Sequence, residues 1–197
     1  MNNIETRRSI RKYTSQPVSH AQIETVINAA RLAPSAKNRQ PWKFIVYTNE
    51  SPEKEKLLNT MESGLKKEQK THALLPLSAF GLPDAMNTLK IMRQAPVVII
   101  VMNTNGHSPY EPIATDARVS EICDSLSIGA AIENMLLCAT DLKLGTLWIA
   151  NTCFAYNDLV DFIKEDGQLI GAVTLGYPAE QPPQRPRKAM EDTLEYR

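Results

Sequence analysis

The stretch at residues 124–145, DSLSIGAAIENMLLCATDLKLG, decides how the rest of the chain can fold. Its apolar residues recur at steps of three and four, which is helical spacing, and its opposite side also carries little charge. A helix that is apolar nearly all round lies in a large core or between packed partners. We therefore predict a central buried helix that Asp124 caps at its start and Gly145 at its end, with part of its surface facing a second subunit.

The composition is that of a soluble domain with a single core. The 197 residues are 43% hydrophobic and 22% charged, and no break in composition divides them, so we expect one domain over residues 1–197. Lys plus Arg equals Asp plus Glu at 22 each, so no overall field favours nucleic acid or anionic lipid as a partner. Glu133, Asn134 and Asp141 interrupt the central helix, which makes it a poor membrane span. The N-terminus lacks an apolar signal core, and we expect a cytoplasmic protein.

The sequence contains no recognisable catalytic or metal-binding motif. Cys123, Cys138 and Cys153 have no CxxC spacing and lie in apolar surroundings, so we expect reduced core thiols. The histidines are isolated from the cysteines, so we expect no metal site. GxSxG, HExxH, P-loop and GxGxxG motifs are absent from the sequence, and we assign no catalytic acid or base. If the protein is an enzyme, its reactive group comes from a cofactor.

Helical and strand patterns alternate along the chain. We predict helices over residues 3–13 (short, with a turn), 19–33 (with a Ser19/Gln22 capping box), 51–70 (charged and solvated), 85–93 and 156–164. We predict strands over residues 42–48, 95–103, 146–151 and 169–177. Residues 71–84 form an apolar loop, which could be a lid, a pocket wall or a contact with a neighbour. Helices interleaved with four strands predict helices covering a central sheet, in an α+β or α/β class.

Two clusters of basic residues lie near opposite ends of the chain. The first contains Arg7, Arg8, Arg11 and Lys12, and the second contains Arg185, Arg187 and Lys188. Each cluster alone is compatible with a solvated basic surface. The alternative is an anion site, because Arg7 and Arg11 would share one face of a helix and arginine holds phosphate oxygens bidentately. If the fold brings the two termini together, a phosphate group is the natural ligand.

The loop at residues 34–42, PSAKNRQPW, allows two interpretations. It could simply connect a helix to a strand. Alternatively, Ser35, Asn38 and Gln40 offer several polar groups within a short loop, which suits a planar polar ligand.

Four segments together resemble the FMN-dependent nitroreductase family: RRSIRKY at 7–13, APSAKNRQPW at 33–42, NMLLCATDLKLGTLWIAN at 134–151, and GYP at 176–178 with RPRK at 185–188. They occur in the family's order and span nearly the whole chain. The resemblance implies an α+β fold, a three-layer α/β/α sandwich with a central mixed, mainly antiparallel sheet. It also implies a homodimer with two FMN sites at its interface, to which the long central helix contributes much of the contact.

The resemblance also implies which residues would contact FMN. The N-terminal phosphate and ribityl contacts would be Arg7, Arg8, Ser9 and Arg11, and the C-terminal phosphate clamp would be Arg185 and Arg187. The loop that the partner subunit lays along the flavin would contain Pro34, Ser35, Ala36 and Asn38. The strand beside the isoalloxazine ring would contain Leu147, Trp148, Ile149 and Ala150. One branch of the family has a Glu-Gly pair near this strand, where this chain has Ile149-Ala150-Asn151.

The reaction implied by the resemblance is ping-pong hydride transfer. NADH or NADPH would pass a hydride to the flavin N5, and a nitroaromatic or quinone would then accept the electrons. Arg11 or Arg187 would place positive charge near the flavin N1 edge and stabilise the reduced anion. Two alternatives stay open: a flavoenzyme of the same fold with dehalogenase-like or flavin-modifying specificity, and a protein without catalysis, either a flavin-binding module or a basic interaction protein.

Overall fold

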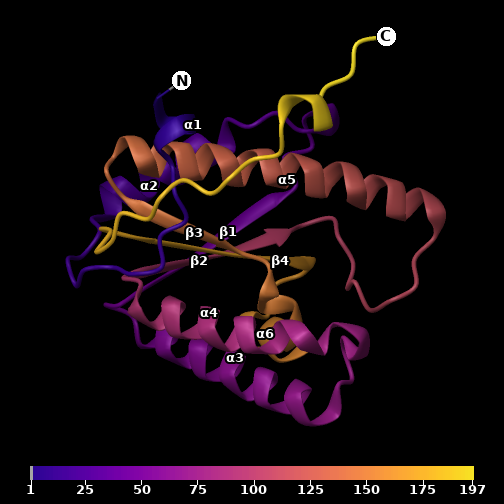
Figure 1. Ribbon diagram of the computed structural model, residues 1–197. Coiled ribbons are helices and arrows are strands. Elements are labelled where there is room, and N and C mark those ends of the chain that lie inside the picture. The colour runs from indigo at the N-terminus through magenta and orange to yellow at the C-terminus, as the bar shows by residue number, and fades with distance from the viewer. Residues whose placement is uncertain (1) are drawn as a thin grey trace.

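The computed structural model describes residues 2–197, which form three layers around one sheet (Figure 1). The strands are β1 (Trp42–Thr48), β2 (Val97–Asn103), β3 (Gly145–Ile149) and β4 (Gln168–Gly176). Their order is β1-β2-β4-β3, and all three pairings are antiparallel. Ser9 adds a single parallel bridge to Thr146 at the β3 edge. The expected α+β sandwich with a mainly antiparallel sheet is confirmed.

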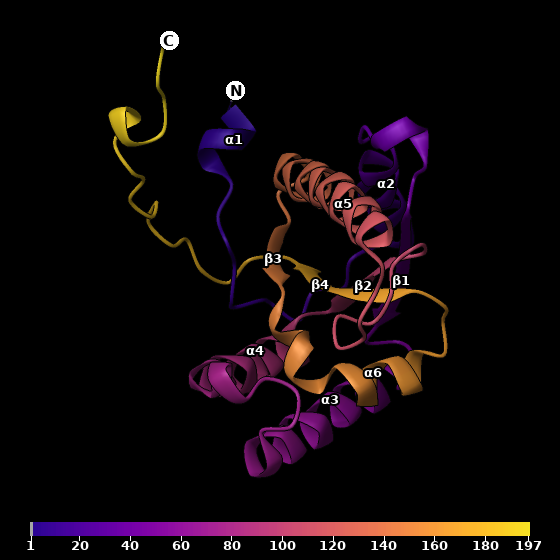
Figure 2. The same cartoon turned by 90° about the vertical axis from the view of Figure 1, so that its right-hand side faces the viewer.

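Helices cover both faces of this sheet. On one face lie α2 (His20–Arg31) and α5 (Thr115–Asp141), and on the other lie α3 (Pro52–Thr71), α4 (Leu82–Gln94) and α6 (Tyr156–Ile163) (Figures 1 and 2). A short helix, α1 (Asn2–Thr6), packs against α5. The 3₁₀ turns are η1 (Ala36–Asn38), η2 (Pro76–Gly81), η3 (Asn151–Ala155) and η4 (Met190–Asp192).

Strand β2 lies at the centre because every one of its residues is apolar or hydrogen-bonded, and all seven are buried. Alternate side chains of a strand point to opposite faces. Val98, Ile100 and Met102 therefore join the core under α3, α4 and α6. Val97, Ile99 and Val101 join the separate core under α2 and α5. One apolar run thus serves two cores, as its unbroken hydrophobicity predicts.

The central helix is longer than predicted, and its expected caps are wrong. It begins at Thr115, so Asp124 lies inside the helix, where it is buried and paired with Arg39. The helix ends before Leu142, and Gly145 instead begins β3. A Cβ atom at position 145 would lie 2.7 Å from the side chain of Ile10, so glycine allows the N-terminal segment to approach β3 closely.

By length and composition alone, α5 could cross a membrane, but the core helix of a soluble protein passes the same test. Its buried residues include Ile128, Ile132 and Met135, which pack into the core with α2. Near its N-terminal end, Val119, Ile122 and Leu126 are exposed at steps of three and four residues, and Leu126 is 72% exposed.

Three further predictions differ from the structure. The N-terminal helix ends at Thr6, so Arg7 and Arg11 do not share a helical face. Helix α3 is not simply solvated, because Lys54 and Glu68 are buried within it. The expected loop at 71–84 contains η2 and the first turn of α4. The Ser19/Gln22 capping box of α2 is confirmed.

Candidate functional site

The two ends of the chain are tied together beside β3 (Figure 2). The Ile10 amide donates to the Thr146 carbonyl at 2.8 Å, and the Ala179 amide donates to the Lys12 carbonyl at 2.9 Å. The Glu180 carboxylate accepts hydrogen bonds from the backbone amides of Arg11 and Lys12, at 2.5 and 3.2 Å. The N-terminal segment therefore lies between the edge strand and the C-terminal segment.

The Tyr13 side chain connects the N-terminal segment to β4. Its hydroxyl donates to the Ile10 carbonyl at 2.9 Å and lies 2.7 Å from the Thr174 hydroxyl of β4. Burial is the main cause that raises the pKa of the Tyr13 phenol above its usual value, so the side chain stays neutral. A neutral, hydrogen-bonded tyrosine fixes the N-terminal segment without adding charge to the site.

A cleft of about 550 Å³ opens between the two tied segments. Its walls bring together six residues of the predicted phosphate site, namely Arg7, Arg8, Ser9, Arg11, Arg185 and Arg187, with the prolines of residues 182–186. Arg7 is the exception among the cations, because its Nε pairs with the Glu133 carboxylate of α5 at 3.2 Å.

The other four arginines of the cleft form no ion pair with any carboxylate in residues 2–197. The guanidinium groups of Arg8, Arg11 and Arg187 instead donate to nearby backbone carbonyls. Arg8 bonds to Glu5 and Arg7, at 2.6 and 2.7 Å, and Arg11 bonds to Ser9 at 3.3 Å. Because unpaired cations this close together repel one another, the cleft is suited to a bound anion.

A second cavity, of about 250 Å³, lies at the end of β3. It is lined by the predicted ring-site residues Leu147, Trp148, Ile149 and Ala150, together with Asn151, Arg11 and one face of α4. Arg11 also lines the first cleft, so the two spaces adjoin at this side chain. The fold thus places a cationic cleft next to a cavity at the edge of the sheet.

The α4 side of this cavity was missed by the sequence analysis. Its residues are Asp84, Asn87, Thr88 and Ile91, whose three- and four-residue steps mark one helical face. The Asn151 amide donates to Asp84 Oδ2 at 3.1 Å and to Thr88 Oγ1 at 2.9 Å. Its Oδ1 atom is buried without a hydrogen-bond partner in the described part of the chain. The cavity therefore has a polar wall formed by α4 and Asn151.

The predicted flavin loop lies elsewhere in the protomer. Pro34, Ser35, Ala36 and Asn38 precede β1, and none of them lines either cavity. Strand β1 is separated from β3 by two strands, which at about 4.8 Å per spacing places the two edges about 14 Å apart. Within one chain, the loop and the arginine cleft therefore stand at opposite edges of the sheet.

The loop has an unusual backbone. Lys37, Asn38 and Gln40 have φ values of 54°, 55° and 50°, in the left-handed region. Each such conformation costs a non-glycine residue about 1–2 kcal/mol. The Ser35 hydroxyl accepts the Gln40 amide at 3.0 Å, and the Ser127 hydroxyl of α5 accepts the Ala36 amide at 3.3 Å. One hydrogen bond within the loop and one to α5 therefore hold the loop in a strained shape.

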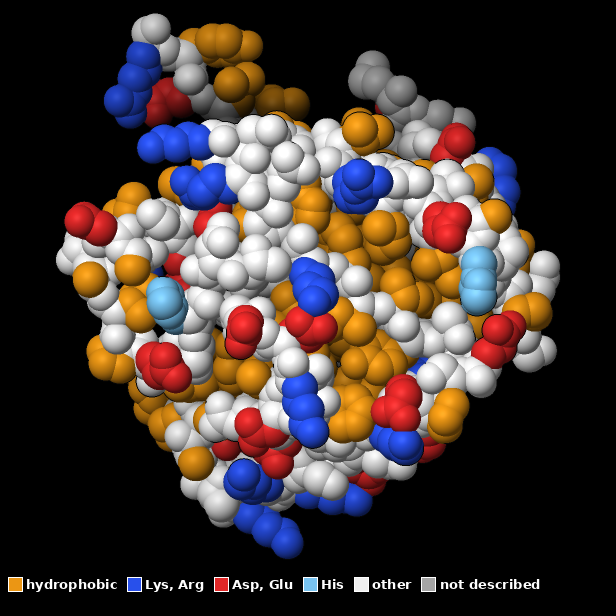
Figure 3. All heavy atoms as spheres, turned by 180° about the vertical axis from the view of Figure 1, so that it is seen from behind, with side chains coloured by type: hydrophobic (Ala, Val, Ile, Leu, Met, Phe, Trp, Pro, Cys, Tyr) orange, Lys and Arg blue, Asp and Glu red, His pale blue; other side chains and the backbone are white. Residues whose placement is uncertain are grey.

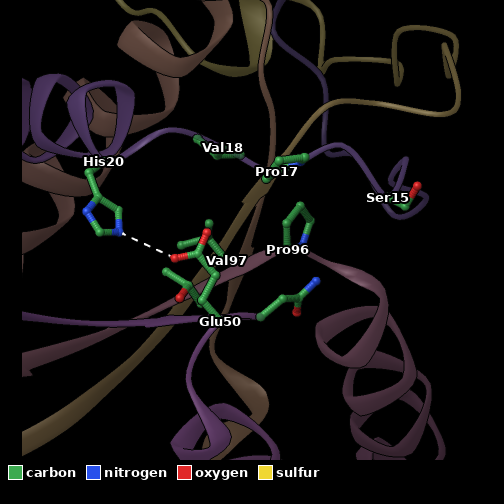
Figure 4. Close-up of a pocket in the computed structure, with 9 residues that line it drawn as sticks. Ser15, Pro17, Val18, His20, Glu50, Pro96 and Val97 are labelled. Atoms are coloured by element: carbon green, nitrogen blue, oxygen red, sulfur yellow. Dashed lines mark ion pairs between the residues drawn. The ribbon is translucent and has the colours of Figure 1, made fainter.

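A further hollow, of about 240 Å³, lies between α2 and the β1 end of the sheet (Figure 4). There the His20 ring lies 3.9 Å from the Glu50 carboxylate, and both side chains are exposed. None of the predicted site residues lines it.

The three cysteines form no disulfide, are half-buried, and show no cluster with the histidines in residues 2–197. Burial raises the pKa of the Cys138 and Cys153 thiols, which keeps them protonated.

Comparison with known proteins places this site in a family. The model of the Nitroreductase family matches residues 4–177. A protein of Archaeoglobus fulgidus, provisionally named NADH dehydrogenase/NAD(P)H nitroreductase, is 30% identical over 185 residues, which cover 90% of this chain and 84% of that protein.

Two solved structures show the same fold. A provisionally assigned nitroreductase from Desulfovibrio desulfuricans, in complex with FMN, is 27% identical with a TM-score of 0.74 and covers 100% of this chain and 95% of its own. A BluB-like flavoprotein from Clostridium difficile is 25% identical with a TM-score of 0.71, covering 99% and 97%. With the match over residues 4–177, these similarities establish that the chain belongs to the nitroreductase family.

Proposed function

We propose that this protein is an FMN-dependent oxidoreductase that takes electrons from NADH or NADPH and passes them to small electron-poor acceptors, such as nitroaromatics and quinones. The observation that carries the proposal is a cleft beside a cavity at the end of β3. In this cleft converge four arginines from both ends of the chain, which have no carboxylate partner among the described residues. The family match supports the reaction class.

The residues present fit FMN. Its phosphate carries up to two negative charges, which the guanidinium groups of Arg8, Arg11, Arg185 and Arg187 can neutralise through bidentate hydrogen bonds. The volume of the cleft is within the range of small-molecule sites. In the adjoining cavity, the Trp148 side chain is 44% exposed, so it offers an apolar surface to a planar aromatic ring.

The role of the protein is then to bind and orient. When bound, FMN supplies the capacity to accept and release two electrons, which amino-acid side chains lack. Arg11 lines both spaces, so it is placed to set positive charge between the phosphate and the ring. Positive charge at the ring edge favours the reduced state. We assign no side chain as a proton donor or acceptor.

A second copy of the chain would complete the site. In one protomer, the loop at 34–38 lies about 14 Å across the sheet from the β3 edge, so it reaches a flavin there only from a partner. Exposed apolar residues supply a surface for that partner, namely Val119, Ile122 and Leu126 on α5. The C-terminal segment also stands out from the body, with Met190, Leu194 and Tyr196 exposed on it (Figure 3). Apolar surface of this kind indicates a protein interface.

The test has two parts. The apoprotein is first titrated with FMN and with riboflavin, and we expect FMN to bind much more tightly because riboflavin lacks the phosphate. Anaerobic oxidation of NADH and NADPH is then followed with a nitroaromatic, with a quinone and with neither. Failure to take up FMN would exclude the proposal, and FMN binding without acceptor-dependent oxidation would leave only a flavin-binding module.

A second candidate is a flavin-modifying enzyme. The 25% identity to a BluB-like flavoprotein over 99% of the chain favours it. The two reactions differ in what happens to the flavin, which is recycled by an oxidoreductase and consumed by a modifying enzyme. Chromatography of the flavin after many turnovers in air distinguishes them, and we expect FMN to be recovered intact.

A further inference from the structure

We propose that Asp124 is a positioning residue that acts through Arg39 to hold the loop of residues 34–40 in the shape that contacts the FMN of a second copy of the chain. The inference rests on the proposed function, because it takes both the flavin and the partner from it. It assigns a role to an ion pair between a buried carboxylate and an exposed arginine that lies outside both cavities.

The ion pair is well defined. Arg39 donates from Nε and Nη2 to Asp124 Oδ1, at 2.9 and 2.6 Å. The other carboxylate oxygen is approached by the Asn105 side-chain amide at 3.4 Å. Asp124 is 2% exposed, and it projects from the middle of α5, the longest helix described. Because Asp124 lies on a rigid helix, its carboxylate is a fixed anchor for the long, flexible side chain of Arg39.

Asp124 binds the loop where its backbone is strained. Arg39 lies between Asn38 and Gln40, two of the residues with left-handed backbone. On the same turn of α5, the Ser127 hydroxyl accepts the Ala36 amide. Two side chains of α5, at positions 124 and 127, thus bind the loop at Arg39 and Ala36, within and just before its strained segment. Without these contacts the backbone would relax toward ordinary conformations.

The strained shape places no apolar side chain in the core. Pro34, Lys37, Asn38 and Gln40 are all exposed in the protomer. An ion pair that buries a carboxylate also adds little net stability compared with apolar packing, and one attested use of such pairs is to specify geometry. The pair therefore fixes the orientation of side chains that face outward, as presentation to a ligand on another chain requires.

The anchor lies on the same turns of α5 as the apolar surface assigned to the partner, but on the opposite face of the helix. Ile122 and Leu126 are exposed two residues to either side of Asp124, whose side chain is buried. A second copy that covers Ile122 and Leu126 would therefore contact the helix that holds the loop. The same helical turns would then set both the dimer contact and the loop that crosses it.

The first experiment compares FMN binding by Asp124→Asn, Arg39→Ala and Arg39→Lys homodimers with that of wild type. We expect dissociation constants for FMN at least tenfold higher for Asp124→Asn and Arg39→Ala, with partial recovery in Arg39→Lys, while the dimer persists in sedimentation. Glu165→Gln is the matched control, because it breaks the exposed Lys43–Glu165 pair that also involves β1. Unchanged FMN binding in the first two variants would overturn the inference.

The second experiment tests whether the anchor acts across the interface. A mixed dimer is purified through two tags from one protomer carrying Arg185→Ala and Arg187→Ala and one carrying Arg39→Ala with Asp124→Asn, so that no unpaired carboxylate remains buried. If the loop acts on the partner's flavin, one site has both intact halves, and we expect one FMN per dimer at wild-type affinity. If the loop acts within its own chain, both sites are defective, and no wild-type site would be found.

Wild-type homodimer is the reference in both experiments. If it takes up no FMN, the proposed function itself fails. If it binds FMN but the mixed dimer has no wild-type site, only the role of Arg39 and Asp124 in the partner's site is overturned.

Discussion

The two edges of the sheet differ in whether their cationic side chains are paired with carboxylates. At the β1 edge, Arg39 is paired with a buried carboxylate and Lys43 with Glu165 at 2.5 Å. At the β3 edge, Arg8, Arg11, Arg185 and Arg187 converge on one cleft without a carboxylate partner in residues 2–197. A paired charge serves the fold, whereas a cluster of unpaired charges favours an anion from outside the chain.

The difference has an origin in topology. The β1 edge is built from nearby loops and α5, so its arginine finds a carboxylate within the core. The β3 edge is built from the two ends of the chain, which Glu180 ties through backbone amides rather than through the guanidinium groups. The Glu180 carboxylate is thus used for backbone hydrogen bonds, and Glu133 pairs with Arg7, so the other four arginines of the cleft remain available.

Removing the unpaired charges should have the largest effect. Arg185→Ala with Arg187→Ala deletes two charged hydrogen-bond donors to phosphate, each worth about 1.5–3 kcal/mol. We expect the dissociation constant for FMN to rise about 100-fold or more, with little change for riboflavin, in fluorescence titrations of the apoprotein. Lys188→Ala is the control, because Lys188 does not line the cleft. Equal losses for FMN and riboflavin would mean that the cleft does not hold the phosphate.

Removing the paired charge should act on stability instead. Arg39→Ala leaves the buried Asp124 carboxylate without its partner, and an uncompensated buried charge costs about 3 kcal/mol. Glu165→Ala breaks an exposed pair and should cost less than about 1 kcal/mol. Urea unfolding monitored by circular dichroism gives both values. Similar losses in the two variants would show that burial does not distinguish the pairs.

Arg11 tests whether one cation serves both cavities. Because it lines both, Arg11→Ala should raise the dissociation constant for FMN and also slow flavin reduction by NADH, each by about tenfold, the effect of about 1.4 kcal/mol. Stopped-flow absorbance measures the second effect at saturating FMN. Lys12→Ala, a neighbouring exposed cation that lines neither cavity, should change neither quantity. A reduction rate unaffected by Arg11→Ala would confine this residue to phosphate binding.

The smallest predicted effect is the change in stability with pH that comes from Lys54. Lys54 is buried, and its ammonium group donates to the Asn49 side chain and to the Ala95 carbonyl, neither of them charged. Burial lowers the pKa of Lys54 to about 8, so above pH 8 the unfolded chain binds more protons than the folded one. The free energy of unfolding should therefore gain about 1 kcal/mol from this group between pH 7 and 9.

The control for this effect is Lys54→Met, which keeps the length of the side chain and removes its charge. The difference in unfolding free energy between wild type and variant should narrow or change in favour of wild type as the pH rises from 7 to 9. A difference that does not depend on pH would show that Lys54 keeps its ordinary pKa.

Local patterns predicted several elements well. The capping box of Ser19 and Gln22 marks the start of α2, and the bounds of β1 match those expected from its aromatic and β-branched residues. These features depend on neighbours in the sequence. The convergence of the arginine clusters came from the family resemblance, since residues 11 and 185 are far apart in the chain.

Other features depend on contacts that the local sequence does not reveal. Asp124 resembles a helix cap, but its partner Arg39 lies 85 residues away, and the helix continues past it. Arg7 and Arg11 have helical spacing, but the pairing of Ser9 with Thr146 draws the chain into an extended form between them. Asn87, Thr88 and Ile91 lie in the helix predicted over 85–93, but their position beside β3 depends on the contact of Asn151 with α4, which no local pattern reveals.

In the proposed dimer, both ends of one chain hold the flavin phosphate, and the 34–38 loop of the other chain contacts the flavin ring. A crystal structure of the FMN complex measures this directly. We predict a dimer in which the phosphate lies between residues 7–11 and 185–187 of one protomer, and the partner's loop contacts the ring. A phosphate bound away from these arginines, or a flavin contacted by one protomer alone, would contradict the account.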